Sequence, residues 1–453
     1  MSHKIIKLSP LVLAVAAAGF STQALSAGFS LFEQGASGQG VAYAGASAVG
    51  EDASTIYFNP AAMTRLSGQQ IVLAGHIVVP KSEYTDSGQS TLPGGPAGSL
   101  TGPNSDGGST GFIPNFYWAA KLDNELHVGV GVNVPFGLAT EYDDGWVGRY
   151  HGLKSEITTI NINPSMAWKA TDTVSLGFGL SFQYIDIELT NNIYSPAVCG
   201  ALGSTCNTAG DSYLKLQGDD MSIGWNVGVL WDITQKDRLG VAYRSDVKHD
   251  VTGNATYTMD SDPALQGTLA VANAAIAPFT LFTDAALTAV ASMPETFSVS
   301  YVRDINDQWS LLADWTWTGW SRLDTVDIVL TGGAPGQDPG LDLAFANTNR
   351  LAVGGHYKPG NNWIFRGGLA YDESPVRSPE QRSARVPDSD RTWLSFGFGY
   401  EPSQSWSIDV GYSHLFVDDA DINNVSKSSS GATLIGTYEA SVDILSAGVN
   451  FNF

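Results

Sequence analysis

The sequence predicts an all-β protein: a transmembrane antiparallel β-barrel of about 14 strands with an N-terminal plug, or hatch, inside the lumen. Three observations indicate this fold. Segments of about ten residues alternate apolar with small or polar residues, short and long connections follow one another, and the last segment, LSAGVNFNF, alternates up to Phe453. This pattern is typical of a barrel in which one strand face meets lipid and the other meets the lumen.

The alternating segments separate large from small side chains. In MSIGWNVGVLWDI, Trp225 and Trp231 share one face, whereas Gly224 and Gly228 share the other. The stretches TWLSFGFGY and SWSIDVGYS repeat this arrangement. A soluble β-sandwich also alternates, but its outward face is polar and charged. Small residues opposite aromatic ones therefore favour the membrane barrel.

The connections predict the topology. About fourteen segments follow Gln69, an even number as expected for a single-chain bacterial barrel. Short turns (LDNE, KATD, TQKD, INDQ, KPGNN and EPSQS) alternate with long connections at residues 81–109, 191–212, 259–292 and 373–391. Because short turns lie at the periplasmic end of such barrels, we expect both termini to be periplasmic.

The first residues predict export to the bacterial outer membrane. Lys4 and Lys7 precede an apolar run and the small-residue stretch STQALSA, which is the layout of a secretory signal peptide. We assign residues 1–26 to this signal. A membrane anchor is the alternative, but the run is shorter than the roughly 18 to 20 apolar residues of a spanning helix.

Charge and cysteine content exclude several classes of function. The net charge of -22 opposes nucleic-acid binding, which requires a basic surface. Cys199 and Cys206 lie close together in a polar loop, and in an exported protein we expect them to form a disulfide. Two thiols alone make a weak metal site, so no metal and no cofactor is predicted. No GxSxG or HExxH motif indicates an enzyme.

One strand is interrupted in its middle. In HVGVGVNVPFGLATEY, residues 127–142, clean alternation stops around Asn133, Pro135, Phe136 and Gly137. Proline cannot donate a ladder hydrogen bond and glycine weakens a strand, so both are usually kept out of central strands. An ordinary bulge that shapes the barrel is one explanation of the break.

Residues 27–68 do not alternate, and taken alone they are either a plug or a flexible tail. The stretch AGFSLFEQGASGQGVAYAGASAVGEDAS, followed by Asn59, Pro60 and Ala61, resembles the hatch of the FadL family of outer-membrane transporters for long-chain fatty acids and aromatic hydrocarbons. The similarity continues in NINPSMAW, YRSDVKHDVTGN and DESPVRSPEQRSARVPDSDRTWLSFGFGY. It therefore spans nearly the whole mature chain.

The resemblance implies a 14-stranded barrel, residues 69–453, closed by the hatch, residues 27–68, with a hydrophobic pocket inside. It also implies a kink in the third strand that opens the wall sideways, and the interrupted stretch is the third strand in our count. A lateral exit has a physical reason, because a fatty acid in a watery channel would expose its chain at roughly 0.8 kcal/mol per CH₂. We therefore expect Asn133, Pro135, Phe136 and Gly137 to form a lateral gate.

Two regions are candidates for contact with a hydrophobic ligand. In the family the extreme N-terminus takes part in the inner pocket, which implies Phe29, with Leu31 and Phe32 beside it. The alternative for Leu31 and Phe32 is that they only seat the plug. The connection between residues 259 and 292 is too apolar for a solvated loop and includes Phe279 and Phe282. It is either a helical pair with an external capture groove, or a loop that packs on itself.

A fatty acid carboxylate in a closed lumen requires a cation. Strand parity directs Arg244, Arg350 and Arg366 inward, so each is a candidate. Where the family's fatty acid transporters carry basic residues near the ends of strands five and nine, this chain offers Asn191 and Asp327. The alternative is that the arginines pair with lumenal or hatch carboxylates for structure alone.

The predicted function is passive import of hydrophobic molecules, most of all long-chain fatty acids. Import of uncharged aromatic hydrocarbons by the same route is the alternative, which the missing cations favour. The expected partners are the hydrophobic ligand, outer-membrane lipid and lipopolysaccharide, with no nucleic acid, and the barrel is expected to be a monomer.

Overall fold

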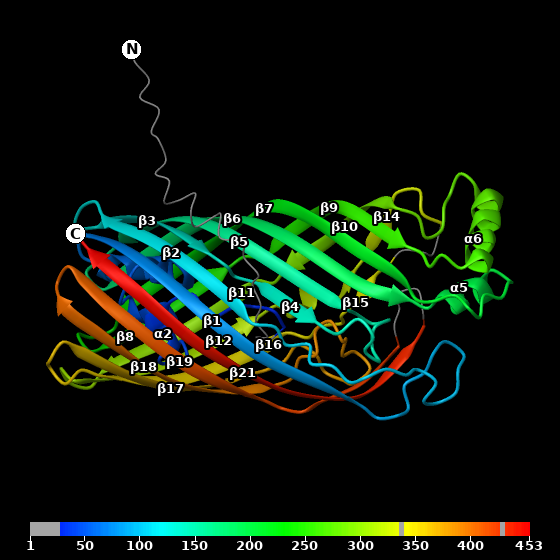
Figure 1. The fold of residues 1–453 in the computed structure, drawn as a ribbon. Helices are drawn as coiled ribbons and strands as arrows, with labels where there is room; N and C mark the ends of the chain where they lie inside the picture. Colours follow the sequence, from blue (N-terminus) through cyan, green and yellow to red (C-terminus); the bar gives the residue numbers. More distant parts are fainter. Residues whose placement is uncertain (1–27, 335–338, 426–430) are drawn as a thin grey trace, which may run out of the picture.

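The computed structural model describes residues 28–334, 339–425 and 431–453, so the predicted signal peptide lies outside the described residues. Antiparallel strands form a closed barrel (Figure 1), because the first strand, β1, pairs with β2 on one side and with the last strand, β21, on the other. Among the described residues, no helix is long and apolar enough to cross a membrane.

The described residues form fourteen barrel strands, which confirms the predicted number. Nine of them are continuous: β1 (Gln69–Asp86), β2 (Gly111–Lys121), β5 (Lys154–Lys169), β6 (Val174–Ile193), β7 (Ser212–Asp232), β16 (Thr348–Tyr357), β17 (Trp363–Asp372), β18 (Arg391–Ser403) and β21 (Thr433–Asn452). Five consist of two pieces: β3 (Leu126–Asn133) with β4 (Gly137–Glu141), β8 (Asp237–Arg244) with β9 (Val247–Thr258), β10 (Ala285–Met293) with β11 (Thr296–Asp304), β12 (Trp309–Thr318) with β14 (Ile328–Leu330), and β19 (Trp406–Val417) with β20 (Ala420–Val425).

The two ends of the barrel differ. Short turns, such as the one between β2 and β3, lie at the end that also holds the C-terminus (Figure 1). The opposite end carries the long connections, including the helices α5 (Ser195–Ala201) and α6 (Pro263–Ile276). A small sheet of β13 (Thr325–Val326) and β15 (Leu341–Asp342), with the 3₁₀ helix η2 (Trp320–Arg322) nearby in sequence, belongs to these connections.

The strand alternation is the one that the sequence predicts. In β7 the side chains of Trp225 and Trp231 are 43% and 45% exposed on the outer surface, whereas Gly228 and Leu230 are buried against the interior. Large apolar side chains on the outside are stable only where lipid covers them, so the exposed band is the membrane-facing surface of the barrel.

The N-terminal segment, Gly28–Gly68, lies within the lumen. It contains four short helices: α2 (Ala36–Gln39), α3 (Ala46–Val49), α4 (Thr55–Phe58) and the 3₁₀ helix η1 (Pro60–Arg65). α2 contacts β18, β19 and β21, α3 contacts β8 and β11, and η1 contacts β5, β6 and β7. One segment can touch strands all round a closed barrel only from inside, which agrees with the buried helices drawn in dark blue in Figure 1.

Glycines in the wall allow this segment to approach the strands closely. A Cβ at Gly228 of β7 would overlap the Asn59 side chain, and one at Gly240 of β8 would overlap the Ser47 carbonyl. The small side chains that the sequence places on the inner strand faces are therefore where the N-terminal segment is seated. The segment therefore fills much of an interior that would otherwise leave an aqueous channel.

The connection between β9 and β10 is shorter than predicted. The expected loop at residues 259–292 contains one helix, α6, rather than a helical pair, and β10 already begins at Ala285. Asp262 starts α6 by accepting hydrogen bonds from the backbone N–H groups of Ala264 and Leu265. Residues 285–293 pair with β9, so their alternation belongs to the barrel wall and not to a loop.

Candidate functional site

The barrel wall has a gap between β2 and β4. β2 pairs with β3 from Phe116 opposite Val132 to Lys121 opposite His127. Among the described residues, the earlier ones of β2, 111–115, pair only with β1. On the other side of the interruption, β4 has β5 as its only strand partner in the described part of the chain. The ladder is therefore open on one side of the interruption at residues 134–136, in the third barrel strand, where the sequence shows Pro135 and Gly137.

The interruption turns the strand toward the interior. Val128, Val130 and Val132 are partly exposed on the outer face, as the alternation requires. Phe136 and Leu138 have the same parity, yet their side chains are buried. Pro135 has no N–H for the ladder, so the chain leaves the sheet here and carries the apolar face inward.

The N-terminal segment supplies the missing ladder partner. The N–H of Leu31 donates to the Pro135 carbonyl and the N–H of Gly137 donates to the Phe29 carbonyl, both at 2.9 Å, so that Ser30 lies opposite Phe136. The Gln34 side chain donates to the Val134 carbonyl at 2.8 Å. These bonds satisfy backbone groups that would be costly to leave unpaired in a membrane wall.

Phe29 connects this gap to an apolar cavity of about 70 Å³. Its ring lies 4.8 Å from the Trp320 ring and 6.2 Å from the Phe136 ring, measured between centroids. Most other lining residues are aliphatic, among them Leu138, Ile157, Leu216, Val251, Leu287 and Met293. Arg385 is the one charged side chain among the described residues that line this inner cavity.

Arg385 belongs to the connection between β17 and β18, which folds into the barrel mouth. Its guanidinium donates to the carbonyls of Lys154 and Thr190, both at 3.2 Å, and to the Ser155 hydroxyl and Asn191 side chain, both at 3.0 Å. Burial lowers the pKa of Arg385 to about 10, so the side chain is protonated at neutral pH.

A second, more polar cavity of about 340 Å³ lies on the other side of Arg385. It is lined by residues from several long connections, including His151, Leu341, Leu343 and Gln381, and by Asn424 of β20. Burial lowers the pKa of His151 to about 4, and the Arg385 charge acts in the same direction, so His151 is neutral at neutral pH. We call this space the outer cavity.

The three arginines predicted from the sequence, Arg244, Arg350 and Arg366, do not line the inner cavity. Arg244 lines a separate cavity of about 50 Å³ together with Leu31 and Phe32, and it donates to the Tyr57 carbonyl at 2.7 Å. Arg350 donates to the Ala42 carbonyl at 2.8 Å, and its guanidinium stacks over the ring of Phe32.

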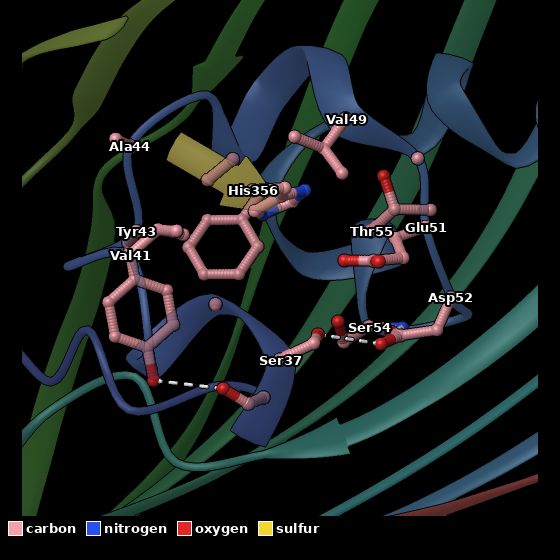
Figure 2. Close-up of a pocket in the computed structure, with 15 residues that line it drawn as sticks. Ser37, Val41, Tyr43, Ala44, Val49, Glu51, Asp52, Ser54, Thr55 and His356 are labelled. Atoms are coloured by element: carbon pink, nitrogen blue, oxygen red, sulfur yellow. Dashed lines mark hydrogen bonds between the residues drawn. The ribbon is translucent and has the colours of Figure 1, made fainter. Parts of the chain in front are cut away.

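Arg366 forms two ion pairs, with Asp409 at 2.6 Å and with Glu51 of the N-terminal segment at 2.9 Å. Glu51 projects with His356 into a small cavity beside that segment (Figure 2). Ser37 also lines it and donates to Asp52 at 2.7 Å. Arg366 therefore fastens the N-terminal segment to the wall and does not reach the inner cavity.

The predicted hatch motif forms a capped turn. Asn59 accepts a hydrogen bond from the N–H of Ala61 at 3.0 Å, and Pro60 occupies the first position of η1. The Asn59 amide also donates to the Ser47 carbonyl at 2.7 Å and to the Val229 carbonyl of β7 at 3.0 Å. One side chain thus closes a helix end and joins it to the barrel.

The long-loop end carries exposed apolar residues. Val271 of α6 is 72% exposed and Phe279, just beyond the helix, is 44% exposed. Phe282 is partly buried, with its ring 5.8 Å from the Tyr257 ring. Cys199 of α5 and Cys206 form a disulfide that holds the neighbouring connection.

Sequence reasoning missed Arg385 and Trp320. A signal for Arg385 is present, because residues 377–391 carry four arginines in a chain with only 23 lysines and arginines. Trp320 gives no such signal, since its role depends on contacts with Phe29 and Phe136, which are distant in sequence.

A closed barrel with an occupied lumen and an apolar cavity beside a wall gap defines the class as an outer-membrane transport protein. Residues 17–453 match the family described as outer membrane protein transport protein (OMPP1/FadL/TodX), and the chain belongs to this family. Its members are transporters of hydrophobic compounds and not enzymes.

Relatives and solved structures agree with this assignment. The chain is 32% identical over 415 residues to the long-chain fatty acid transport protein of Escherichia coli O6:H1 (89% of this chain, 90% of the relative), and 30% identical over 417 residues to outer membrane protein P1 of Haemophilus influenzae (86% of each). The structure of a Pseudomonas aeruginosa FadL homologue superposes with a TM-score of 0.85 at 26% identity, covering 94% of this chain and all of that one.

Proposed function

We propose that this protein imports long-chain fatty acids passively across the outer membrane and releases them sideways through the gap between β2 and β4. The observation that carries the proposal is the position of Phe29, which lines the inner cavity and pairs by its carbonyl with Gly137 at the gap. A molecule in the cavity thus lies beside the interrupted piece of wall, whose ladder partner is the N-terminal segment.

The route has three parts. Ligand would first meet the apolar residues near α6, including exposed Phe279 and partly buried Phe282, at the end that we place outside the cell. It would then occupy the inner cavity, while residues 28–68 act as a hatch that closes the lumen toward the periplasm, where both termini lie. It would leave through the gap into lipid or lipopolysaccharide, which avoids exposing its chain to water. One barrel contains every part of this route, so we propose a monomer.

The test locks residues 29–31 onto the wall. Ser30 and Phe136 face each other without direct hydrogen bonds between them, a pairing in which Cα atoms are about 4.5 Å apart, within the range for a disulfide. The oxidised S30C/F136C variant should lose uptake of radiolabelled oleate by cells, and a reducing agent should restore it. The F136C single variant, with and without reducing agent, controls for the lost ring and for the native disulfide.

Mass spectrometry would verify the cross-link, and heat-modifiable gel mobility would verify the fold. If the cross-linked protein takes up oleate as fast as F136C does, the ligand does not pass this gap.

The small volume of the inner cavity favours a second candidate function, import of compact uncharged aromatic hydrocarbons. Mass spectrometry of the molecules that co-purify with the barrel separates the two functions. Fatty acids support the first, and neutral aromatic molecules alone support the second.

A further inference from the structure

Arg385 stands at the junction of two cavities. Together with Leu341 and Leu343 it lines both the outer cavity and the inner one. The outer cavity has mixed walls that include the polar side chains of Gln381 and Asn424 and the exposed carboxylates of Asp342 and Glu380. The inner cavity is lined almost entirely by hydrocarbon. Arg385 therefore lies where a more polar environment changes to an apolar one. An amphiphile with one charged end has the same two parts, a charged group and a hydrocarbon chain.

Arg385 is also a buried cation with neutral partners. Its hydrogen bonds go to two carbonyls, a hydroxyl and an amide oxygen. None of the ion pairs among the described residues includes it. Arg366, by contrast, is equally buried but pairs with two carboxylates. A buried charge without a counter-ion is costly, and an anionic ligand would offset that cost.

The surrounding residues hold the guanidinium in place. The four acceptors come from β5 and from the end of β6, and Gly152 leaves room for the side chain, since a Cβ there would lie 3.2 Å from Arg385 Cγ. The Arg385 carbonyl accepts a hydrogen bond from Thr140 of β4 at 3.3 Å. The cation is therefore fixed before any ligand arrives, which lowers the entropy lost on binding.

We propose that Arg385 binds the carboxylate of a fatty acid whose hydrocarbon chain enters the inner cavity. This inference rests on the proposed function and narrows it, because such a site selects amphiphiles with one negative charge over uncharged hydrocarbons. A charge-assisted pair with a guanidinium fork is shorter, stronger and more directional than a hydrogen bond between neutral groups.

The experiment measures equilibrium binding of oleate and of its uncharged ester, methyl oleate, to purified barrels. The variants are R385M, R385K and R377M. Arg377 lies in the same connection but is exposed, so R377M removes one charge without touching either cavity. Wild type and R377M should bind oleate with similar affinity. R385M should lose about tenfold to a hundredfold in oleate affinity and keep its affinity for methyl oleate within about twofold, while R385K should lose less.

Heat-modifiable gel mobility confirms that each variant is folded, and R385K remains informative where R385M fails to fold. Equal losses for oleate and methyl oleate in both Arg385 variants, or no loss for oleate, would overturn the role of Arg385 while leaving the proposed function intact. A wild-type barrel that binds neither oleate nor methyl oleate would overturn the proposed function and this inference with it.

Discussion

Asp388 accepts a hydrogen bond from the backbone N–H of Gly28 at 2.9 Å, although 360 positions separate the two residues. The same carboxylate accepts a hydrogen bond from the Ser374 hydroxyl at 2.7 Å and forms a buried ion pair with Arg391. The connection that carries Arg385 therefore also anchors the beginning of the N-terminal segment, directly next to Phe29.

Replacing Asp388 with Asn should loosen this anchor. The variant keeps the shape of the side chain but loses its charge, and breaking a buried ion pair costs about 3 kcal/mol or more. We expect chymotrypsin to cleave folded D388N faster at Phe29, Leu31 or Phe32, as identified by mass spectrometry. The S374A variant, which removes a neighbouring hydrogen bond but leaves Gly28 its acceptor, should stay resistant. Equal resistance of D388N and wild type would show that the anchor contributes little.

Replacing Asn59 with Ala should destabilise the seat of the hatch. The change removes the cap of η1, worth about 1 kcal/mol, and the two bonds to the Ser47 and Val229 carbonyls. We expect frequent channel openings of N59A in planar bilayers. N59S keeps a capping oxygen but not the two amide donors, and should be intermediate. Large steady conductance of the wild-type barrel would contradict the closing role of residues 28–68.

Replacing Gly137 with Trp should block uptake. A Cβ at this position would already lie 3.0 Å from Leu31, so an indole cannot fit unless the gap changes shape. We expect cells with G137W to lose oleate uptake although the barrel folds, as judged from gel mobility. G145W is the matched control, because nothing lies within 4 Å of a Cβ at Gly145. Undiminished uptake by folded G137W would mean that the interruption is only a structural bulge.

Acid should weaken the packing around His151. Its pKa is about 4 in the folded protein and 6.5 in an unfolded chain, so its stabilising contribution is complete above pH 6.5 and is lost as the pH falls toward 4. The loss at pH 5 is about 2 kcal/mol. Hydrogen exchange of residues 142–153, corrected for intrinsic rates, should rise at pH 5 relative to pH 7.5 in wild type. H151Q should show no such change, and an equal rise in both proteins would exclude His151 as the cause.

The strands could be read from the sequence because a membrane barrel imposes one simple rule, lipid outside and small residues inside. The alternation of residues 221–231 follows directly from it, and so does the visible break at Pro135. The long connections follow no such periodic rule. Residues 285–293 extend the barrel strand of β11 beyond the residues that the alternation marks. Only their pairing with β9 identifies them as part of the wall.

Side-chain partners were harder to predict than strand positions. Parity correctly directed Arg366 inward, but it could not show that Asp409 and Glu51 already neutralise it. Arg385 lies in a connection without regular structure, and its four partners come from residues 154, 155, 190 and 191. Such a site depends on how a loop folds back over the barrel, which no local pattern records.

The β-bridge between Ser30 and Phe136 involves only a few residues, and this has a consequence for the rate of release. Two main-chain hydrogen bonds and the Phe29 ring hold residues 29–31 to the wall, which together are worth on the order of 3 kcal/mol. Asn59 and the Arg366 ion pairs meanwhile fix the rest of the segment. Under the proposed route, three residues could therefore detach while the other residues stay in place. A free-energy difference of this size between the closed and the detached state leaves about 0.1 to 10% of molecules open at any moment. Such local motions exchange within microseconds to milliseconds. Thermal motion alone would then set the rate of release.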